Sequence, residues 1–340
     1  MRSPNDNAWS SLGRIGRAFF LSPKRWHAAG LLVAIAGLLL TLNALNLANS
    51  YVGRNFITAL AQRDRNQFLR FAAFYLGVFA ASSLTAVSAQ YVQDRLAISW
   101  RGWMTQHLTD RYLSGDTHDE ISARTDIDNP DQRIAEDVRA FTSTLLSFAI
   151  MLTNSVVTLL VFAGVLWSIT PLLLLAAVLY AALGSAFTIL IGYRLVGLNN
   201  QQLSREADMR HGLIHVRQNG QPLDEQAVQD EASGVRARLQ RVIHNSMAII
   251  RVTRNVGFFT SGYNYMVPIL PVLIVAPLYL RGSIELGVVT QSAMAFAQLL
   301  GALSLIVAQF GSISAFAAVA RRLGSLWEAM ETTGEFEARA

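Results

Sequence analysis

Residues 125–141 read TDIDNPDQRIAEDVRAF, and seven of these seventeen residues are charged although apolar segments lie a short distance away on both sides. The Asn129–Pro130 pair predicts a turn, because a residue that precedes proline avoids the α-helical region. The charges after the proline suit the first turns of a new helix, on which Glu136 and Arg139 can pair. Two interpretations remain open: a solvated loop with helix caps, and a partner-docking point at the tip of a helical hairpin.

The composition around this stretch is that of a membrane protein. The chain has 340 residues, of which 52% are hydrophobic and only 15% are charged, whereas soluble domains carry about 25% charged residues. There is no cysteine, so disulfides, zinc thiolates and thiol nucleophiles are excluded. The chain is therefore expected to lie in a lipid bilayer.

The basic residues exclude two further classes of function. The net charge is +5, and Lys24 is the only lysine in the chain. A phosphate-binding loop needs a Gly-Lys-Ser/Thr sequence, whereas Lys24 lies in SPKRW, so the chain has no such loop for ATP hydrolysis. The arginines are dispersed and no base-stacking module is present, so we expect no nucleic-acid partner.

Six stretches reach the roughly 20 apolar residues that a transmembrane helix needs. Tight turns, SITPLL and RGSIELG, join the third span to the fourth and the fifth to the sixth. The long segments after the second and fourth spans have apolar residues at helical spacing, so we expect cytoplasmic helix extensions that turn at crossbars near 116–130 and 218–226. The expected spans are 28–48, 71–92, 145–168, 172–193, 256–280 and 286–318, the last being one helix of about 50 Å.

The distribution of arginine predicts the orientation. Segment 194–254 holds nine arginines, and the N-terminal segment holds five basic residues. Cytoplasmic loops of membrane proteins are enriched in such residues, so both termini and both long loops are expected in the cytoplasm. Four arginines in the first outer loop, between residues 54 and 70, oppose this assignment. Residues 1–27 are expected to form a basic amphipathic helix on the membrane surface, with Trp9, Leu12, Phe19 and Phe20 on one face.

Neutral polar residues, rather than charges, occur within the spans. None of the six spans contains Asp, Glu, Lys, Arg or His, which argues against a proton relay. Gln291, Gln298 and Gln309 would share one face of a regular helix, and Asn264 belongs to a polar cluster in the fifth span. These four residues are the candidate substrate pathway, and interhelical hydrogen bonding is the alternative. For Asn43, Asn46 and Asn49 hydrogen bonding between helices is the favoured interpretation.

Metal and catalytic sites are not expected. The HGLIH sequence at 211–215 lacks the Glu that follows the first His of a zinc-protease helix. The DIDNPDQRIAED stretch begins like a calcium loop, but Pro130 and Asp131 replace the ligand and the glycine that such a loop needs.

The sequence resembles a known family over most of its length, from about Phe20 to Glu331. The motifs are DNPDQRIAEDVRAF, LAISWRGWMT (96–105), GVLWSIT (164–170), SREADMRHGLIHVRQNG (204–220), APLYLRGSIELGVVTQSAMAF (276–296) and LSLIVAQFGSISAFAAVARRL (303–323). They are similar to the ABC-transporter membrane domains of the peroxisomal fatty-acyl and bacterial YddA- and BacA-like group. The resemblance implies an all-α, exporter-type (type I exporter, or type IV) membrane domain with six helices per chain. It also implies a homodimer of twelve spans, with two coupling helices per chain that contact nucleotide-binding domains.

The resemblance also implies which residues couple the chain to its partner. In the first cytoplasmic hairpin these are Asn129, Pro130, Asp131, Gln132, Arg133, Glu136 and Asp137. In the second, Glu206, Ala207, Arg210 and Gly212 resemble an EAA-like motif. Two features depart from the family pattern: GQPLDEQAVQDE replaces the usual run after Asn219, and the sequence does not contain the ATPase domain that usually follows. That domain is expected to have been removed, to belong to another polypeptide, or not to be used.

These observations predict three segments: the interfacial residues 1–27, the membrane domain 28–325 and the beginning of a linker at 326–340. The expected function is the permease part of an ABC half-transporter in a bacterial inner membrane, with ATP and Mg bound by a partner nucleotide-binding domain. The alternative is an ATPase-free, proton-coupled peptide-uptake permease that resembles the BacA-like branch. A non-transport membrane protein is the third possibility.

Overall fold

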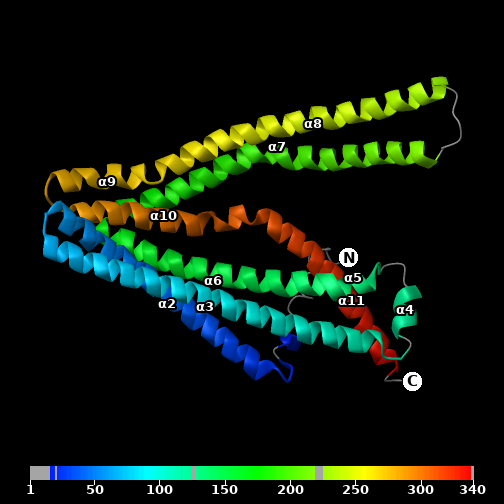
Figure 1. Cartoon of the computed structure of the whole chain (residues 1–340), viewed down its shortest axis with the longest axis horizontal. Helices are drawn as coiled ribbons and strands as arrows, with labels where there is room; N and C mark the ends of the chain where they lie inside the picture. Colours follow the sequence, from blue (N-terminus) through cyan, green and yellow to red (C-terminus); the bar gives the residue numbers. More distant parts are fainter. Residues whose placement is uncertain (1–15, 20, 116, 124–126, 219–224, 338–340) are drawn as a thin grey trace.

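The computed structural model describes residues 16–19, 21–115, 117–123, 127–218 and 225–337 (Figure 1). Throughout these residues the regular elements are helices. Their bounds are α2 Arg25–Ala61, α3 Arg65–Tyr112, α4 Thr117–Ala123, α5 Pro130–Gln132, the π-helix η1 Arg133–Asp137, α6 Val138–Ile169, α7 Pro171–Gln218, α8 Glu225–Met266, α9 Ile269–Leu280, α10 Leu286–Ala308 and α11 Phe310–Glu337.

Six helical segments are long and apolar enough to cross a membrane. They are Arg25–Ala61, Arg65–Tyr112, Pro130–Ile169, Pro171–Arg217, Ala232–Leu280 and Leu286–Leu305. Each overlaps one of the spans predicted from the sequence, so the all-α, six-span fold class is confirmed. Most of these helices are much longer than the roughly 20 residues that a bilayer needs, which agrees with the predicted extensions.

Three tight connections lie at one end of the molecule, here named the turn end (left in Figure 1). Between α2 and α3, Arg63 adopts a left-handed backbone with φ 59°, and the Asp64 carboxylate caps α3 by accepting the Gln67 backbone N–H at 3.0 Å. Pro171 begins α7 directly after α6, as the sequence predicts. Gly282, with φ +73°, turns the chain after α9.

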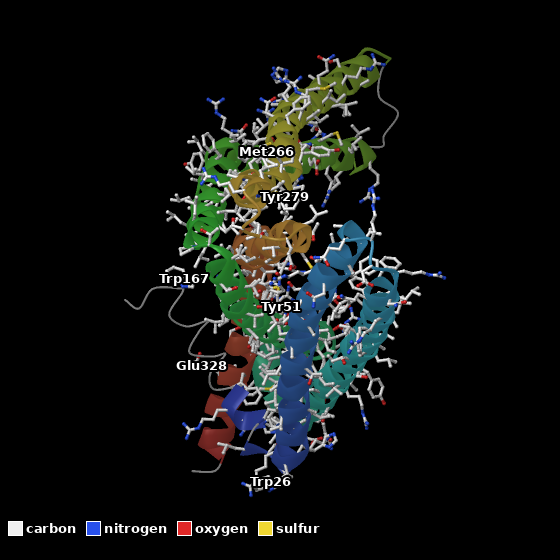
Figure 2. All side chains as sticks on the ribbon, turned by 90° about the vertical axis from the view of Figure 1, so that its left-hand side faces the viewer. Trp26, Tyr51, Trp167, Met266, Tyr279 and Glu328 are labelled. Atoms are coloured by element: carbon white, nitrogen blue, oxygen red, sulfur yellow. The ribbon has the colours of Figure 1, made fainter. Side chains whose placement is uncertain are left out.

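Side chains at the edges of the spans are typical of a bilayer interface. Trp26, in the first turn of α2, is 76% exposed, and Trp167, near the end of α6, is 62% exposed. Figure 2 looks onto the turn end and labels both tryptophans at different places on the outer surface. Tryptophan is enriched at the level of the lipid headgroups, so their positions are consistent with a membrane that crosses the apolar part of the bundle.

The buried residues form two separate cores. One lies toward the turn end, where α6, α7, α9 and α10 bury Phe162, Leu166, Leu173, Val275 and Phe296 among others. At Gly287, α10 approaches α2 so closely that an added Cβ would lie 2.0 Å from the Arg54 carbonyl oxygen. Only glycine permits that contact between the two backbones.

The second core lies at the opposite end, around α11. It joins the beginning of α2, the end of α3, α4 and α6 to α11 through Trp100, Met104, Phe141, Leu323 and Trp327 among others. The prediction of one helix over 286–318 is wrong, because the chain is interrupted at Gln309 between α10 and α11 (Figure 1). The sequence FGSIS that follows contains a glycine and two serines, which are weak helix formers. The interruption lets α11 turn away from α10 and bury its apolar residues in this core.

Helices α7 and α8 extend beyond the other helices as a two-helix arm (Figure 1). The amide nitrogen of Asn245 on α8 donates to the Leu198 carbonyl at 2.9 Å and to the Gln202 side chain at 2.8 Å, both on α7. The two helices of the arm pack mainly against each other along this part. Large apolar side chains are exposed on them, among them Leu190, Tyr193, Val196, Ile250 and Phe258.

Candidate functional site

The charged stretch at 125–141 folds against the C-terminal helix. We name this region the hairpin junction: residues 127–137 together with the end of α3, α4 and α11. Asn129 adopts a left-handed backbone with φ 44°, and Pro130 is the first residue of α5. This agrees with the predicted turn, because proline restricts the residue before it and asparagine tolerates the left-handed region. The next turn, Arg133–Asp137, is a π-helix, a form that occurs often at functional sites.

Arg133 is the centre of the junction. Arg133 is buried, with only 3% of the residue exposed, and its guanidinium donates to two segments, the hairpin and α11. Nε donates to the Asp128 carbonyl at 2.9 Å, Nη2 donates to the Asp128 carboxylate, and Nη1 donates at 2.8 Å to both the Arg322 carbonyl and the Ser325 hydroxyl. One buried side chain therefore ties the hairpin to α11.

Two carboxylates complete this charge cluster. The hydrogen bond and the positive charge of Arg133 hold the pKa of Asp128 below its usual value, so this carboxylate stays ionised at neutral pH. Asp137 is buried and forms an ion pair with Arg322, with 2.9 Å between Oδ2 and Nη2. The junction thus contains two arginine–carboxylate pairs, and each involves a buried partner.

Aromatic rings extend the junction to the N-terminal segment and to α3. Phe19 is fully buried and stacks on Trp100 with 5.3 Å between ring centroids. Further along α3, the ring of His107 lies between Trp103, at 5.3 Å, and Trp327 of α11, at 5.2 Å. Phe19 therefore packs inside the protein and not on the lipid-facing side of an interfacial helix. The other residues of that predicted face, Trp9, Leu12 and Phe20, lie outside the described residues.

The surface of the junction carries acidic and amide side chains. Asn129, Asp131, Gln132 and Glu136 are exposed, as are Asp119 and Glu120 of α4, and Pro130 is half-buried. The predicted pair of Glu136 and Arg139 does not form in the described structure; Glu136 instead accepts from the Gln132 amide at 3.2 Å. The predicted coupling residues thus divide into a buried pair, Arg133 and Asp137, and an exposed group that a partner can reach.

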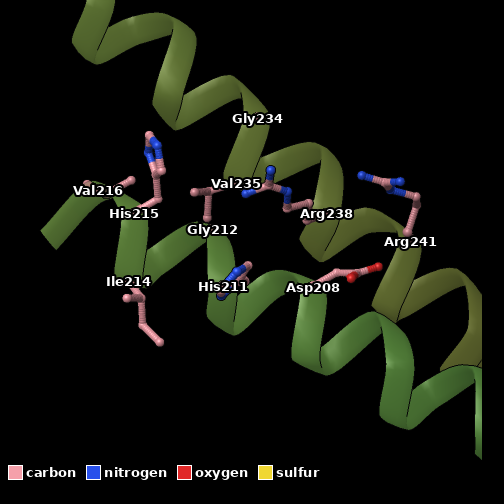
Figure 3. Close-up of a pocket in the computed structure, with 10 residues that line it drawn as sticks. All are labelled: Asp208, His211, Gly212, Ile214, His215, Val216, Gly234, Val235, Arg238 and Arg241. Carbon is pink, nitrogen blue, oxygen red and sulfur yellow. The ribbon is translucent and has the colours of Figure 1, made fainter. Parts of the chain in front are cut away.

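The second set of predicted coupling residues lies on the α7–α8 arm. Glu206, Ala207 and Arg210 are exposed on α7, and the Glu206 carboxylate accepts from Gln202 at 2.9 Å. Gly212 faces Arg238 of α8 (Figure 3). The structure does not bring this set to the hairpin junction (Figure 1). Most of the predicted crossbar at 218–226 lies outside the described residues, since 219–224 are not described.

The candidate pathway residues occupy different environments. Gln291 is buried and donates to the Ser50 hydroxyl of α2 at 3.2 Å. This is the hydrogen bonding between helices that the sequence analysis gave as the alternative to a substrate pathway. Gln298 and Asn264 are exposed, and Gln309 is half-buried at the interruption after α10. The argument for a common face requires one regular helix, so it does not extend to Gln309.

The asparagines of α2 supply a second polar contact between helices. The Asn43 amide nitrogen donates to Asn154 Oδ1 at 2.9 Å, and its oxygen accepts from the Thr158 hydroxyl at 3.0 Å. Both partners belong to α6. For Asn43 the prediction of hydrogen bonding between helices is confirmed.

The partners on α11 were not predicted as site residues. Arg322 and Ser325 lie in a stretch of α11 whose apolar residues Leu323, Leu326 and Trp327 are all buried. That helical spacing was available in the sequence as a sign of a packed helix. The spacing does not show that Arg322 and Ser325 contact the buried Asp137 and Arg133, because these contacts join residues far apart in the sequence.

Comparison with known proteins gives a consistent result. The family model described as ABC transporter transmembrane region 2 matches residues 15–280. The chain is 37% identical over 317 residues to "ABC transporter D family member 2, chloroplastic" of Arabidopsis thaliana, a match that covers 93% of this chain and 45% of that protein. An ABC transporter ATP-binding protein of Synechocystis is 36% identical over 318 residues, which cover 90% of this chain and 47% of the relative.

A more distant relative has the same pattern of coverage. The inner membrane ABC transporter ATP-binding protein YddA of Escherichia coli is 23% identical over 333 residues, which cover 90% of this chain and 58% of YddA. The chain spans about half the length of the curated relatives it matches.

Proposed function

Because the chain belongs to the ABC transporter transmembrane region 2 family, we propose that it is the membrane half of an ATP-driven transporter, with ATP and Mg bound by a nucleotide-binding domain outside this sequence. Relatives that carry ATP-binding in their names are about twice as long as the part they share with this chain. Lys24 is its only lysine and is not part of a phosphate-binding loop. Nucleotide hydrolysis is therefore assigned to the partner.

The hairpin junction is the observation that carries this proposal. Asp131 and Glu136 offer charges at the surface, while Arg133 in the same helical turns is locked to the backbone and side chain of α11. A force applied to the surface residues is thereby transmitted to α11 and, through α6, to the third span. The contacts of Arg133 suit this role because removal of a partner would leave a buried guanidinium unpaired, which is strongly unfavourable.

The α7–α8 arm supports a homodimer. Its exposed apolar residues, including Leu190, Tyr193 and Phe258, have no covering helix from the described part of the same chain. Each helix of the arm has more than 40 residues, or more than about 60 Å, so the arm reaches well past a hydrocarbon core of about 30 Å. We assign the inner face of the arm to contact with a second copy of the chain. The lipid bilayer covers its outer face.

The arginine-rich arm and the hairpin junction lie on the cytoplasmic side in this proposal. The nine arginines of 194–254 support that orientation under the positive-inside rule. Residues of α11 lie at the same end as the arm (Figure 1). The proposed location is a bacterial inner membrane, with both termini in the cytoplasm.

We assign the exposed amides Gln298 and Asn264 to the substrate pathway, since amides are disfavoured against lipid. The chain has no cysteine, so single-cysteine variants need no background removal. A cysteine at Gln298 is expected to react with a membrane-impermeant thiol reagent. Cysteines at Gln291 and Leu300, which are 3% and 4% exposed, are the matched protected positions. Equal labelling of all three, or an unreactive cysteine at 298, would remove α10 from the pathway.

The source of energy separates this proposal from a proton-coupled permease. The six predicted spans contain no Asp, Glu, Lys, Arg or His, whereas proton relays in membrane proteins are built from such residues. Sealed vesicles that contain only this chain are therefore expected to show no uptake of labelled peptides in response to an imposed pH gradient. Vesicles that contain a known proton-coupled peptide permease serve as the positive control. Acid-driven uptake by this chain without ATP would overturn the proposal.

A further inference from the structure

A groove rich in arginine lies between the two helices of the arm, away from the hairpin junction. Its larger part, of about 590 Å³, is lined by Asp208, His211 and Gly212 of α7 and by Arg238 and Arg241 of α8 (Figure 3). An adjoining part of about 320 Å³ shares Asp208 and both arginines and adds Arg205. From this geometry we infer that the groove binds a water-soluble phosphate ester or pyrophosphate.

The charges of the groove are unbalanced. Among the described residues that line the groove, the three guanidinium groups of Arg205, Arg238 and Arg241 outnumber the one carboxylate, of Asp208, which leaves a formal charge of +2 on these residues with histidines counted as neutral. In the described structure Arg238 and Arg241 have no carboxylate within ion-pair distance, and their guanidiniums have no hydrogen-bond partner. A phosphate monoester carries about −1.5 to −2 charges at neutral pH, and arginine forks bind its oxygens in pairs.

Gly212 leaves the space that one of these arginines occupies. The Arg238 side chain crosses from α8 onto Gly212, so an added Cβ at 212 would lie 1.9 Å from Nη1 and 3.0 Å from Cζ (Figure 3). No side chain larger than glycine leaves the guanidinium where it is. Arg205 is held, because its Nη1 donates to the Arg241 carbonyl at 3.0 Å. One of the three cations, Arg205, is thus held in place by a hydrogen bond, and the Arg238 guanidinium occupies the space that Gly212 leaves.

The position of the groove along the arm excludes a lipid headgroup. Arg205 lies 12 residues beyond the predicted end of the fourth span at 193, which is about 18 Å along a helix. The headgroup layer extends only about 5–8 Å beyond the hydrocarbon core on each side. The ligand therefore comes from solution, and when bound it would bridge α7 and α8.

Titration calorimetry with pyrophosphate in chloride buffer tests the inference, with the full chain in phosphatidylcholine nanodiscs. We expect saturable binding that is weakened roughly tenfold or more in Arg238→Gln, because a charge-assisted hydrogen bond is lost. Gly212→Ala should weaken binding similarly while it retains every charge. Gly192→Ala on the same helix, where an added Cβ meets nothing within 4 Å, should bind like the wild type. Thermal melting of each variant shows that it is folded.

Two results would overturn the inference: absence of saturable pyrophosphate binding by the wild type, or equal binding by wild type and Gly212→Ala. A second set of nanodiscs containing phosphatidylglycerol separates the two sources of phosphate. Unchanged pyrophosphate affinity supports a soluble ligand, whereas its loss in those discs means that a lipid headgroup occupies the groove. The assay involves no ATP hydrolysis, so its failure would not bear on the proposed transport function.

Discussion

Substitution of Arg133 by methionine is expected to release α11 from the hairpin junction and to destabilise the fold by about 3 kcal/mol. Arg133 is buried and donates to Asp128, to the Arg322 carbonyl and to Ser325. Methionine fills similar space but donates no hydrogen bond, so the Arg322 carbonyl and the Ser325 hydroxyl lose the partner that joins them to the hairpin. The free energy of unfolding, measured by denaturant titration in detergent, reports the global effect.

Hydrogen exchange measures the local effect of the same substitution. Amides of α11 around Ser325 are expected to exchange faster in Arg133→Met, because helix stability there depends on packing against the hairpin. Arg139→Met is the matched control, since Arg139 lies in the first turn of α6 and its side chain is exposed. Unchanged exchange in α11 after Arg133→Met would show that α11 does not depend on the junction.

The six spans and the turn at Asn129–Pro130 were predictable because they depend on local signals. Apolar length determines a span, and proline restricts the residue before it. The interruption at Gln309 was missed for a physical reason: the stretch is apolar enough to span a membrane, and the glycine and serines after Gln309 weaken a helix without necessarily ending it. The change in direction is favoured by the distant burial of Phe316 and Trp327 in the core at the hairpin junction.

In the candidate site, too, the features set by local sequence were predictable and those set by distant packing were not. The motif identified the stretch from Asn129 to Asp137 as a unit, and the sequence correctly placed it at the beginning of a helix. It did not separate the buried Arg133 and Asp137 from the exposed Asp131 and Glu136, because the distinction depends on where α11 packs. The glutamines illustrate the limit of periodicity. Gln291 and Gln298 share a face of α10, but Gln291 is buried and bonds to α2, whereas Gln298 is exposed.

The proposed coupling through the exposed hairpin is tested by the vanadate-sensitive ATPase activity of the transporter complex purified from its membrane. We expect that activity to fall roughly tenfold or more in the Asp131→Ala, Glu136→Ala double variant, because typical coupling free energies correspond to factors of that size. Both side chains are exposed, so membrane insertion and thermal stability should remain those of the wild type. Arg139→Ala, an exposed change nearby, should retain full activity. Wild-type ATPase activity in the double variant would contradict the assignment of the hairpin junction as the coupling site.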